Sequence, residues 1–224
     1  GADPQRRFSP CCGRIKLAPA HKNLSFDTVP CRFADKEALA FSGQGKLPVL
    51  VDDDQVISDS WRIASYLGRT YPDAPSLFGG ETGLPLVRFI NSWADTILIP
   101  GVLRLVLADI PGHLHEGDLA YFRESRETRL GATLEQFCAD RDAHLQTFEH
   151  LLMPLRHLLR EQDFIAGEAP NYADYSVFGA FQWARCISDR PLLAANDTVV
   201  GWTQRILDLY DGLAGSAPGY ALTR

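Results

Sequence analysis

The pattern of apolar and polar residues changes partway along the chain. Residues 1–79 combine short β-like apolar runs with stretches of helical spacing. Two apolar runs, 46–53 and 54–60, are joined by a turn-like run of aspartates, which predicts a β-hairpin. After the hairpin, apolar residues recur at helical spacing until Pro72, where a helix should stop. The predicted elements are helix 13–24, strand 25–33, strands 46–53 and 54–60, and helix 60–72.

Beyond residue 84 the β-like pattern disappears and long helical stretches take its place. Residues 173–187 are apolar on nearly every side, which is typical of a helix buried in the middle of a bundle. The glycine-rich segment 78–84 predicts a linker between two domains. We therefore expect an α/β domain over residues 1–78 and an all-helical domain over 85–224. The predicted helices of the second domain are 85–109, 118–128, 133–162 with a kink or break at Pro154, 173–187 and 198–212.

Composition narrows the classes of function. The chain has 224 residues, of which 46% are apolar, enough for a sizeable core. Its net charge is -6 with scattered basic residues, which argues against a nucleic-acid surface and against an anionic membrane as partner. No run approaches the roughly 18 apolar residues that a membrane helix needs, and we expect no secretory leader. The 5 cysteines are irregularly spaced, so we expect reduced thiols in a cytoplasmic protein.

Two short motifs in the first part carry candidate chemistry. Pro48 stands at the start of an apolar run, where a proline is tolerated in a strand. Its peptide bond is either trans or cis, and a cis bond is rare enough to imply a specific role. Asp59 and Ser60 lie where a strand gives way to a helix. Ser60 is suited either to cap that helix or to bind a carboxylate with the backbone N–H groups, and Asp59 is suited to hold an ammonium group. A carboxylate beside an ammonium group is the amino-acid end of a γ-glutamyl group.

A third motif lies in the helical domain. The stretch PNYADYSVFGAF supplies Asn171 as an N-cap and Asp174 three residues later, a capping box with asparagine in place of serine or threonine. Pro48, the Asp59–Ser60 pair and this capped helix, in this order and spacing, resemble the cytosolic glutathione transferase family over nearly the whole chain. The resemblance implies a thioredoxin-like N-terminal domain with a cis-proline, a helical C-terminal domain, glutathione as co-substrate, and a homodimer.

Within that family, the stretches RRFSPCCGR (6–14) and SDSW (58–61) look most like the bacterial and fungal branch that includes the lignin β-aryl-ether-cleaving enzymes. Those enzymes typically have Ser-Pro followed by an aromatic residue, and a tryptophan before the arginine. This chain has Cys11 and Gly13 at those places, beside the sulfur of glutathione and the acceptor pocket. The resemblance therefore implies a glutathione transferase with an aromatic or aryl-ether electrophile, and a pocket that differs from those of its relatives.

The same stretch holds the candidates for activating the glutathione sulfur. Aligned on the S-x-x-x-x-R pattern, Ser9 takes the catalytic position of the serine-type transferases, and Arg14 follows it. A free thiol has a pKa of about 8.5, and a hydroxyl at the start of a helix can stabilise the thiolate by donating a hydrogen bond. Cys11 and Cys12 are the alternative, because a cysteine-type enzyme forms a mixed disulfide with glutathione. We predict Ser9 as the catalytic residue.

Further residues acquire roles only through the resemblance. It implies that Lys46 and Leu47 bind glutathione together with Pro48 and the Asp59–Ser60 pair, with the backbone of Leu47 pairing with the cysteinyl part of the tripeptide. The candidate side chains for the acceptor pocket are Phe8, Trp93 and Phe181.

Two other functions stay open from the sequence. One is a cysteine-dependent glutathione lyase or thioltransferase, and the other is a non-catalytic glutathione-binding or interaction module. We predict no metal site, because His113 and His115 have no third ligand nearby in the sequence. We expect glutathione and a small hydrophobic electrophile as the ligands, with neither nucleic acid nor membrane as partner. The resemblance also implies a strand before the first helix, and we expect about 8 strand-like residues upstream of Gly1.

Overall fold

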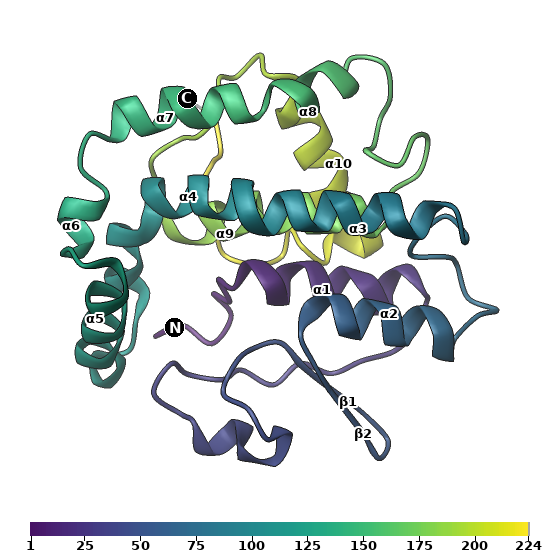
Figure 1. Ribbon diagram of the computed structural model, residues 1–224, viewed down its shortest axis with the longest axis horizontal. Helices are drawn as coiled ribbons and strands as arrows, with labels where there is room; N and C mark the ends of the chain where they lie inside the picture. Colours follow the sequence, from purple (N-terminus) through teal and green to yellow (C-terminus); the bar gives the residue numbers. More distant parts are fainter. Residues whose placement is uncertain (224) are drawn as a thin grey trace.

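The structure, a computed structural model that describes residues 1–223, combines one β-hairpin with a bundle of helices (Figure 1). This is the predicted fold class of a small α/β part followed by a helical part. The first part contains α1 (Pro10–His21), the 3₁₀ helix η1 (Glu37–Ser42), β1 (Val49–Asp52), β2 (Gln55–Ser58) and α2 (Ser60–Thr70). The second part contains α3 (Gly83–Trp93), the π-helical turn η2 (Ala94–Leu98), α4 (Ile99–Val106), the 3₁₀ segment η3 (Leu107–His113), α5 (Glu116–Leu130), α6 (Leu134–Phe137), α7 (Arg141–Leu151), α8 (Met153–Leu158), α9 (Tyr172–Ile187) and α10 (Thr198–Gly212).

The predicted hairpin is confirmed. β1 and β2 run antiparallel with Val51 opposite Val56, and the turn between them places Asp53 at a positive φ of 49°. The Leu47–Pro48 peptide bond at the entry to β1 is cis. The proline is buried and directly precedes Val49, the first residue of β1.

The strand predicted over residues 25–33 is wrong, because this segment has no strand in the structure. β1 and β2 pair only with each other, and no other strand of the described residues lies alongside segment 25–33. A strand without a neighbour would leave its backbone N–H and C=O groups unpaired, so the segment runs as an irregular loop. The helix predicted over 13–24 begins earlier, at Pro10, and ends at His21.

The long helices predicted over 85–109 and 133–162 are interrupted. The first is divided into α3, η2 and α4, and the π-helical turn η2 lies beside α9. The second is divided into α6, α7 and α8, with Pro154 in the first turn of α8. Proline lacks a backbone N–H and suits the start of a helix, which explains the break expected there.

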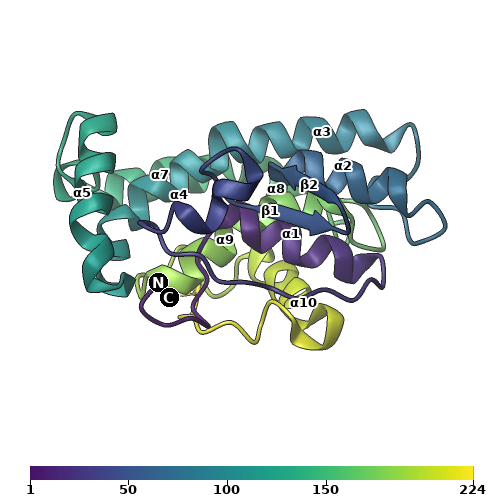
Figure 2. The ribbon, with the colours of Figure 1, turned by 90° about the horizontal axis from the view of Figure 1, so that it is seen from below.

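Helix α9 occupies the centre of the bundle, as predicted. Every residue from Tyr172 to Ala184 is buried, and α9 contacts α1, α3 and α4. Figures 1 and 2 show α1 lying along α9, with α2 and the hairpin on the outer side of α1. A Cβ atom at Gly179 would lie 2.5 Å from the carbonyl oxygen of Pro10, so glycine is needed for this close approach. The bundle therefore fixes the position of the first turn of α1.

The start of α9 is held by a buried carboxylate. The Asp174 side chain is fully buried and accepts the N–H of Asn171 at 3.1 Å, which completes a capping box with Asn171 as N-cap. It also accepts the N–H groups of Ile165 at 2.7 Å and Ala166 at 3.3 Å, and the Nε1–H of Trp202 at 2.9 Å. Burial raises the pKa of the Asp174 carboxyl, and these hydrogen bonds oppose the rise. One side chain thus joins α9, the loop before it and α10.

Candidate functional site

Ser9 lies at the N-terminus of α1. Its backbone is extended, with φ −101° and ψ 124°, and its Oγ accepts the backbone N–H of Cys12 at 3.2 Å. Pro10 follows in the first helical turn, where its missing N–H costs nothing. Because Oγ accepts a bond from the helix, its own proton can be donated to a ligand. The helix N-terminus also favours negative charge at this point.

The two cysteines that follow Ser9 have different neighbours. The Ser60 side chain lowers the pKa of the Cys11 thiol, whereas the Ser9 side chain lowers the pKa of the Cys12 thiol. Burial raises the pKa of the Cys11 thiol, and Arg14 opposes the rise. Burial raises the pKa of Cys12 to about 11. A thiol that keeps its proton at neutral pH is a poor nucleophile, so the surroundings favour Ser9 over either cysteine.

The start of α2 adjoins this end of α1. Asp59 is the N-cap of α2, at a positive φ of 79°, and its carboxylate accepts the N–H groups of Trp61 and Arg62 at 3.0 Å each. Ser60 is the first residue of the helix and is only 5% exposed. The hydroxyl of Tyr172 donates to the Ser60 carbonyl at 2.9 Å, which anchors this turn to α9. From the sequence, Ser60 was a candidate for the N-cap of this helix, but Asp59 occupies the N-cap position.

The cis-proline turn lies against the same helix start. The Pro48 carbonyl accepts the Asp59 N–H at 3.3 Å. Just before it, the Gln44 side chain holds Lys46 by accepting its N–H at 2.6 Å and donating to its carbonyl at 2.8 Å. The side chains of Lys46 and Leu47 are exposed. The structure therefore places the predicted glutathione-binding residues and Ser9 around the adjoining ends of α1, α2 and β1.

The three aromatic residues predicted for the acceptor pocket have different surroundings. Phe181 is fully buried and its ring contacts those of Phe148 and Trp202, so it has no surface for a substrate and is a core residue. Phe8 is 7% exposed and also belongs to the core. Trp93 is half-buried. Trp93 is therefore the one of the three that we retain for the acceptor pocket.

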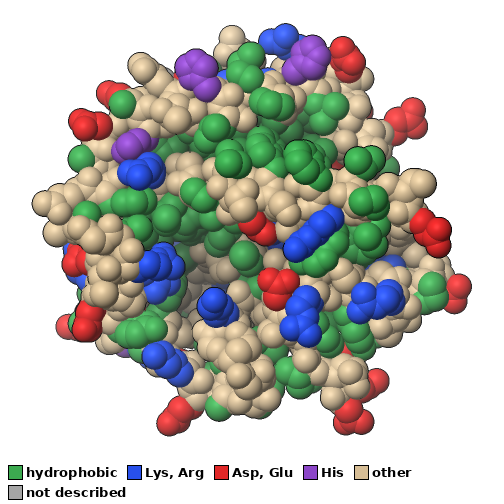
Figure 3. Space-filling view, viewed as in Figure 1, with side chains coloured by type: hydrophobic (Ala, Val, Ile, Leu, Met, Phe, Trp, Pro, Cys, Tyr) green, Lys and Arg blue, Asp and Glu red, His purple; other side chains and the backbone are tan. Residues whose placement is uncertain are grey.

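The surface near the start of α1 is hollowed. Figure 3 shows a hollow with apolar side chains in its wall, bordered by α4, the N-terminal end of α1 and the segment that leads into β1. A concave surface with apolar walls beside a few polar groups is typical of a small-molecule site. The hollow therefore lies at the end of α1 that Ser9 caps.

Beneath this site lies a polar network that the sequence did not predict. The Arg14 side chain is fully buried; one guanidinium nitrogen is 2.8 Å from a carboxylate oxygen of Asp95, and another donates to the Asn91 amide oxygen at 3.1 Å. The Asn91 amide donates to Asp95 at 2.9 Å, and the Ser176 hydroxyl donates to Asn91 at 3.2 Å. Asn91 and Asp95 interrupt an apolar helical stretch at a spacing of four residues, which was the signal available in the sequence.

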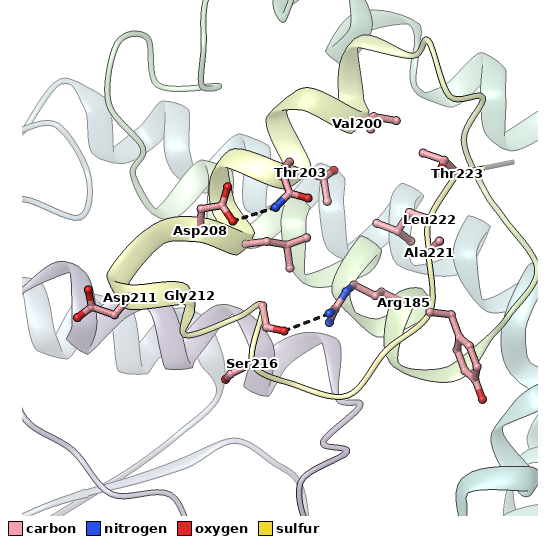
Figure 4. A pocket seen from close by; sticks show the side chains of 14 residues that line it. Arg185, Val200, Thr203, Asp208, Asp211, Gly212, Ser216, Ala221, Leu222 and Thr223 are labelled. Atoms are coloured by element: carbon pink, nitrogen blue, oxygen red, sulfur yellow. Dashed lines mark hydrogen bonds between the residues drawn. The ribbon is translucent and has the colours of Figure 1, made fainter.

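A second hollow, of about 660 Å³, lies between α10 and the C-terminal segment (Figure 4), and neither Ser9 nor the start of α2 lines it. Arg185 lies at one edge, where its guanidinium donates to the carbonyl groups of Gly215 and Ala217. None of the residues predicted for glutathione lines this hollow. It is therefore separate from the candidate site.

Residues 1–223 hold no group of three or more histidine, cysteine, aspartate or glutamate side chains arranged to bind a metal ion. His113 bonds with the Ile187 carbonyl at 2.6 Å, and His115 accepts the Gly117 N–H at 3.2 Å. In the same part of the chain, no helix combines the length and the apolar character needed to span a membrane.

Comparisons with known proteins identify the family of both parts of the chain. A family model described as "Glutathione S-transferase, N-terminal domain" matches residues 5–75, and one described as "Glutathione S-transferase, C-terminal domain" matches residues 86–206. Glutathione S-transferase Z2 of Arabidopsis thaliana is 34% identical over 99 residues, which are 42% of this chain and 43% of that protein. A probable maleylacetoacetate isomerase of Caenorhabditis elegans is 34% identical over 73 residues, 31% of this chain and 34% of that protein. The matched stretches thus span less than half of either relative.

The fold has matches over almost its whole length. Glutathione transferase GSTFuA3 from Phanerochaete chrysosporium superposes with a TM-score of 0.73 at 24% identity, covering 94% of this chain and 88% of that one. At this identity the likeness establishes the fold alone. The C-terminal family model by itself matches more than half of the 224 residues. The chain therefore belongs to the glutathione S-transferase family.

Proposed function

We propose that this protein is a serine-type glutathione transferase in which Ser9 activates the sulfur of bound glutathione. The observation that carries the proposal is the meeting of three features at one place: the Ser9 hydroxyl at the start of α1, the cis-proline turn at Pro48, and the Asp59–Ser60 pair at the start of α2. They offer a hydrogen-bond donor for a thiolate, a backbone edge for a peptide, and a helix N-terminus for a carboxylate.

In the proposed reaction the Ser9 O–H donates to the glutathione sulfur while the first-turn amides of α1 add positive potential. The thiol loses its proton to solvent, and the thiolate attacks an electrophilic carbon. With an aryl ether as substrate, a C–S bond forms as the C–O bond breaks, and the phenolate leaves with the bonding electron pair. Ser9 keeps its proton throughout and acts as a donor.

We propose an aromatic or aryl-ether electrophile as the first acceptor class, supported by the likeness of RRFSPCCGR to the aryl-ether-cleaving branch. The names of the Arabidopsis and Caenorhabditis relatives do not mention aryl-ether cleavage. The isomerase relative suggests a second class, a conjugated cis-alkene such as maleylacetoacetate, to which the thiolate adds and from which it leaves after bond rotation. Parallel assays with the two acceptor classes decide between them.

A second candidate function is a glutathione lyase or thioltransferase that uses Cys11. The observation in its favour is that Arg14 lies three residues after Cys11 on the same helix and lowers the pKa of its thiol, because a positive charge stabilises a thiolate. Opposing it, burial raises the pKa of this thiol. We place Ser9 first for that reason.

Glutathione should raise the melting temperature of the protein, and Ser60→Ala should reduce this effect. A saturating ligand at about 100 times its Kd stabilises a protein by about 2.7 kcal/mol. Loss of a hydrogen bond to a carboxylate costs about 1.5–3 kcal/mol, so we expect the Kd of the variant to rise at least tenfold. Thermal unfolding with and without glutathione measures both effects.

The matched control is Ser125→Ala, which removes a hydroxyl of α5 that donates to the Phe122 carbonyl and accepts from Arg126, both within the same helix. It should respond to glutathione like the wild type. If the wild type itself shows no response, the proposal gives way to a non-catalytic interaction module. If Ser60→Ala binds glutathione as well as the wild type does, Ser60 lies outside the binding site.

We also propose that the protein is a homodimer and works in the cytoplasm. Leu86 and Phe89, three residues apart on α3, are each 69% exposed. Val51 and Val56, opposite each other in the hairpin, are 55% and 45% exposed. Large exposed apolar side chains on α3 and on the hairpin support burial against a second copy. Light scattering should give twice the chain mass, and Phe89→Glu should give a monomer; a wild-type monomer at high concentration would contradict the dimer.

A further inference from the structure

The Arg14 guanidinium is a buried positive charge directly under the candidate site. It lies three residues after Cys11 on α1, and residues at this spacing share one face of a helix. A buried charge is tolerated only when it is paired, and Asp95 supplies the partner at 2.8 Å. Asn91 contacts both members of the pair and holds their geometry. Arg14 and Asp95 thus form a neutral unit.

The backbone around Asp95 is unusual. Asp95 lies in η2, a π-helical turn inserted between α3 and α4. Such turns are rare and frequently occur at functional sites, because they change the direction of side chains on one face of a helix. The Asp95 side chain is 40% exposed, whereas that of Arg14 is fully buried. Asp95 therefore reaches from the solvent side of the site to the buried guanidinium.

Cys11 lies within the field of this pair. The charged groups that act on its thiol are Arg14 from α1, Asp95 from η2, and Asp59 from the start of α2. Burial raises the pKa of Cys11 most; Arg14 lowers it, while Asp95 and Asp59 raise it. The Ser60 side chain also lowers it. Without Asp95, the Arg14 charge would act on the thiol without opposition from its partner.

We propose that Asp95 is a positioning residue that, by pairing with Arg14, withholds the guanidinium charge from Cys11, which helps to keep Cys11 in its thiol form and leaves sulfur activation to Ser9. The statement that sulfur activation is left to Ser9 rests on the proposed function. The same helix face thus contains the groups for two chemistries, and Asp95 adds to the effect of burial in disfavouring the cysteine chemistry. Removal of that carboxylate should move the site toward cysteine chemistry.

The chemistry that Asp95 suppresses is thiol–disulfide exchange. A Cys11 thiolate would attack one sulfur of glutathione disulfide, forming a bond between Cys11 and that glutathionyl group. The bond between the two glutathionyl sulfurs breaks, and one glutathione leaves as a thiolate that takes up a proton from water. The exchange conserves the number of disulfide bonds and needs no other oxidant.

The test is the pH dependence of Cys11 alkylation by iodoacetamide in a Cys12→Ser background, measured by mass spectrometry of the peptide between Arg7 and Arg14. In Asp95→Asn the midpoint should move about one pH unit lower, and the rate at neutral pH should rise about tenfold. The plateau rate at high pH, where Cys11 is fully ionised, should not change, because that rate reports exposure of the sulfur. The rate of mixed-disulfide formation with glutathione disulfide at neutral pH should rise in parallel.

Three variants serve as controls. Asp95→Glu keeps the charge and should keep the wild-type midpoint. Asp95→Ser removes the same charge with a smaller side chain and should reproduce the shift, so the test does not depend on one variant folding. Asp208→Asn removes an exposed carboxylate on α10, whose side chain bonds to Gln204, and should change nothing.

An unchanged midpoint in both charge-removing variants would overturn the proposal. A higher plateau with the wild-type midpoint would also overturn it, since that result means that Asp95 only limits access to the sulfur. Alkylation needs no glutathione, so these outcomes are independent of transferase activity. Failure of the wild type to conjugate glutathione would refute the proposed function and leave the role of Asp95 in Cys11 ionisation standing.

Discussion

Replacing Ser9 with alanine should lower kcat/KM for glutathione conjugation by about 100-fold or more, because removal of one donor to a developing or stabilised anion typically costs that much. The effect should appear as a loss of thiolate at neutral pH, with glutathione binding largely kept, because the carboxylate and peptide contacts lie elsewhere. Ser9 also caps α1 through the Cys12 N–H, so a stability loss of about 1 kcal/mol should accompany the change. Initial rates at several glutathione concentrations separate the two effects.

The matched variants are Cys11→Ala and Cys12→Ala, which alter the neighbouring side chains and leave the Ser9 hydroxyl in place. Both should keep conjugation within a few-fold of the wild type. Full conjugation by Ser9→Ala together with an inactive Cys11→Ala variant would establish the cysteine mechanism in place of ours. Ser9→Thr keeps a hydroxyl and should recover part of the lost rate.

Asp174→Ala should lower the free energy of unfolding by about 3–5 kcal/mol. It leaves four donors without their acceptor: the N–H groups of Ile165, Ala166 and Asn171, and the indole N–H of Trp202. Each unsatisfied buried group costs about 1–3 kcal/mol, although relaxation and water entry recover some of the sum. Asp174→Asn keeps one acceptor oxygen and should lose less. Urea unfolding followed by circular dichroism measures the change.

A second capping box supplies the control for Asp174. Thr133 caps the short helix α6 through the Gln136 N–H at 3.1 Å, in an exposed position. Thr133→Ala should cost only about 1 kcal/mol, because water can replace the lost bond. If Thr133→Ala and Asp174→Ala lower the free energy of unfolding by similar amounts, burial at the start of α9 does not increase the contribution of its cap to stability.

The features that could be predicted from the sequence are those with a strong local cause. The hairpin over 46–60 was predictable because its two apolar runs are joined by aspartates suited to a turn, and Asp53 adopts the positive φ that the turn requires. The central position of α9 was predictable because a helix that is apolar on all sides is stable only when all of its faces are buried. The catalytic role of Ser9 stays a prediction, which rests on the spacing to Arg14 and on the resemblance to the serine-type transferases.

The features that could not be predicted depend on neighbours distant in the sequence. Residues 25–33 look like a strand, but a strand exists only where another strand can pair with it, and β1 and β2 pair only with each other. The ring of Phe181 looked available for a substrate until packing against Phe148 and Trp202 placed it in the core.

The network under the site was hidden for the same reason. Arg14, Asn91 and Asp95 come from α1, α3 and η2, and no local pattern pairs a residue of the first helix with one about 80 positions later. A polar pair spaced by four residues in an apolar helix signals a buried network, but does not name its partner.

The most direct test of the account is the titration of glutathione bound to the protein, followed by the ultraviolet absorbance of its thiolate. Free thiols ionise with a pKa of about 8.5, and we predict that the bound thiol of the wild type ionises at least one pH unit lower. The shift should disappear in Ser9→Ala and persist in Cys11→Ala. A bound thiol that titrates like a free one, or a shift that survives in Ser9→Ala and is lost in Cys11→Ala, would contradict the central claim.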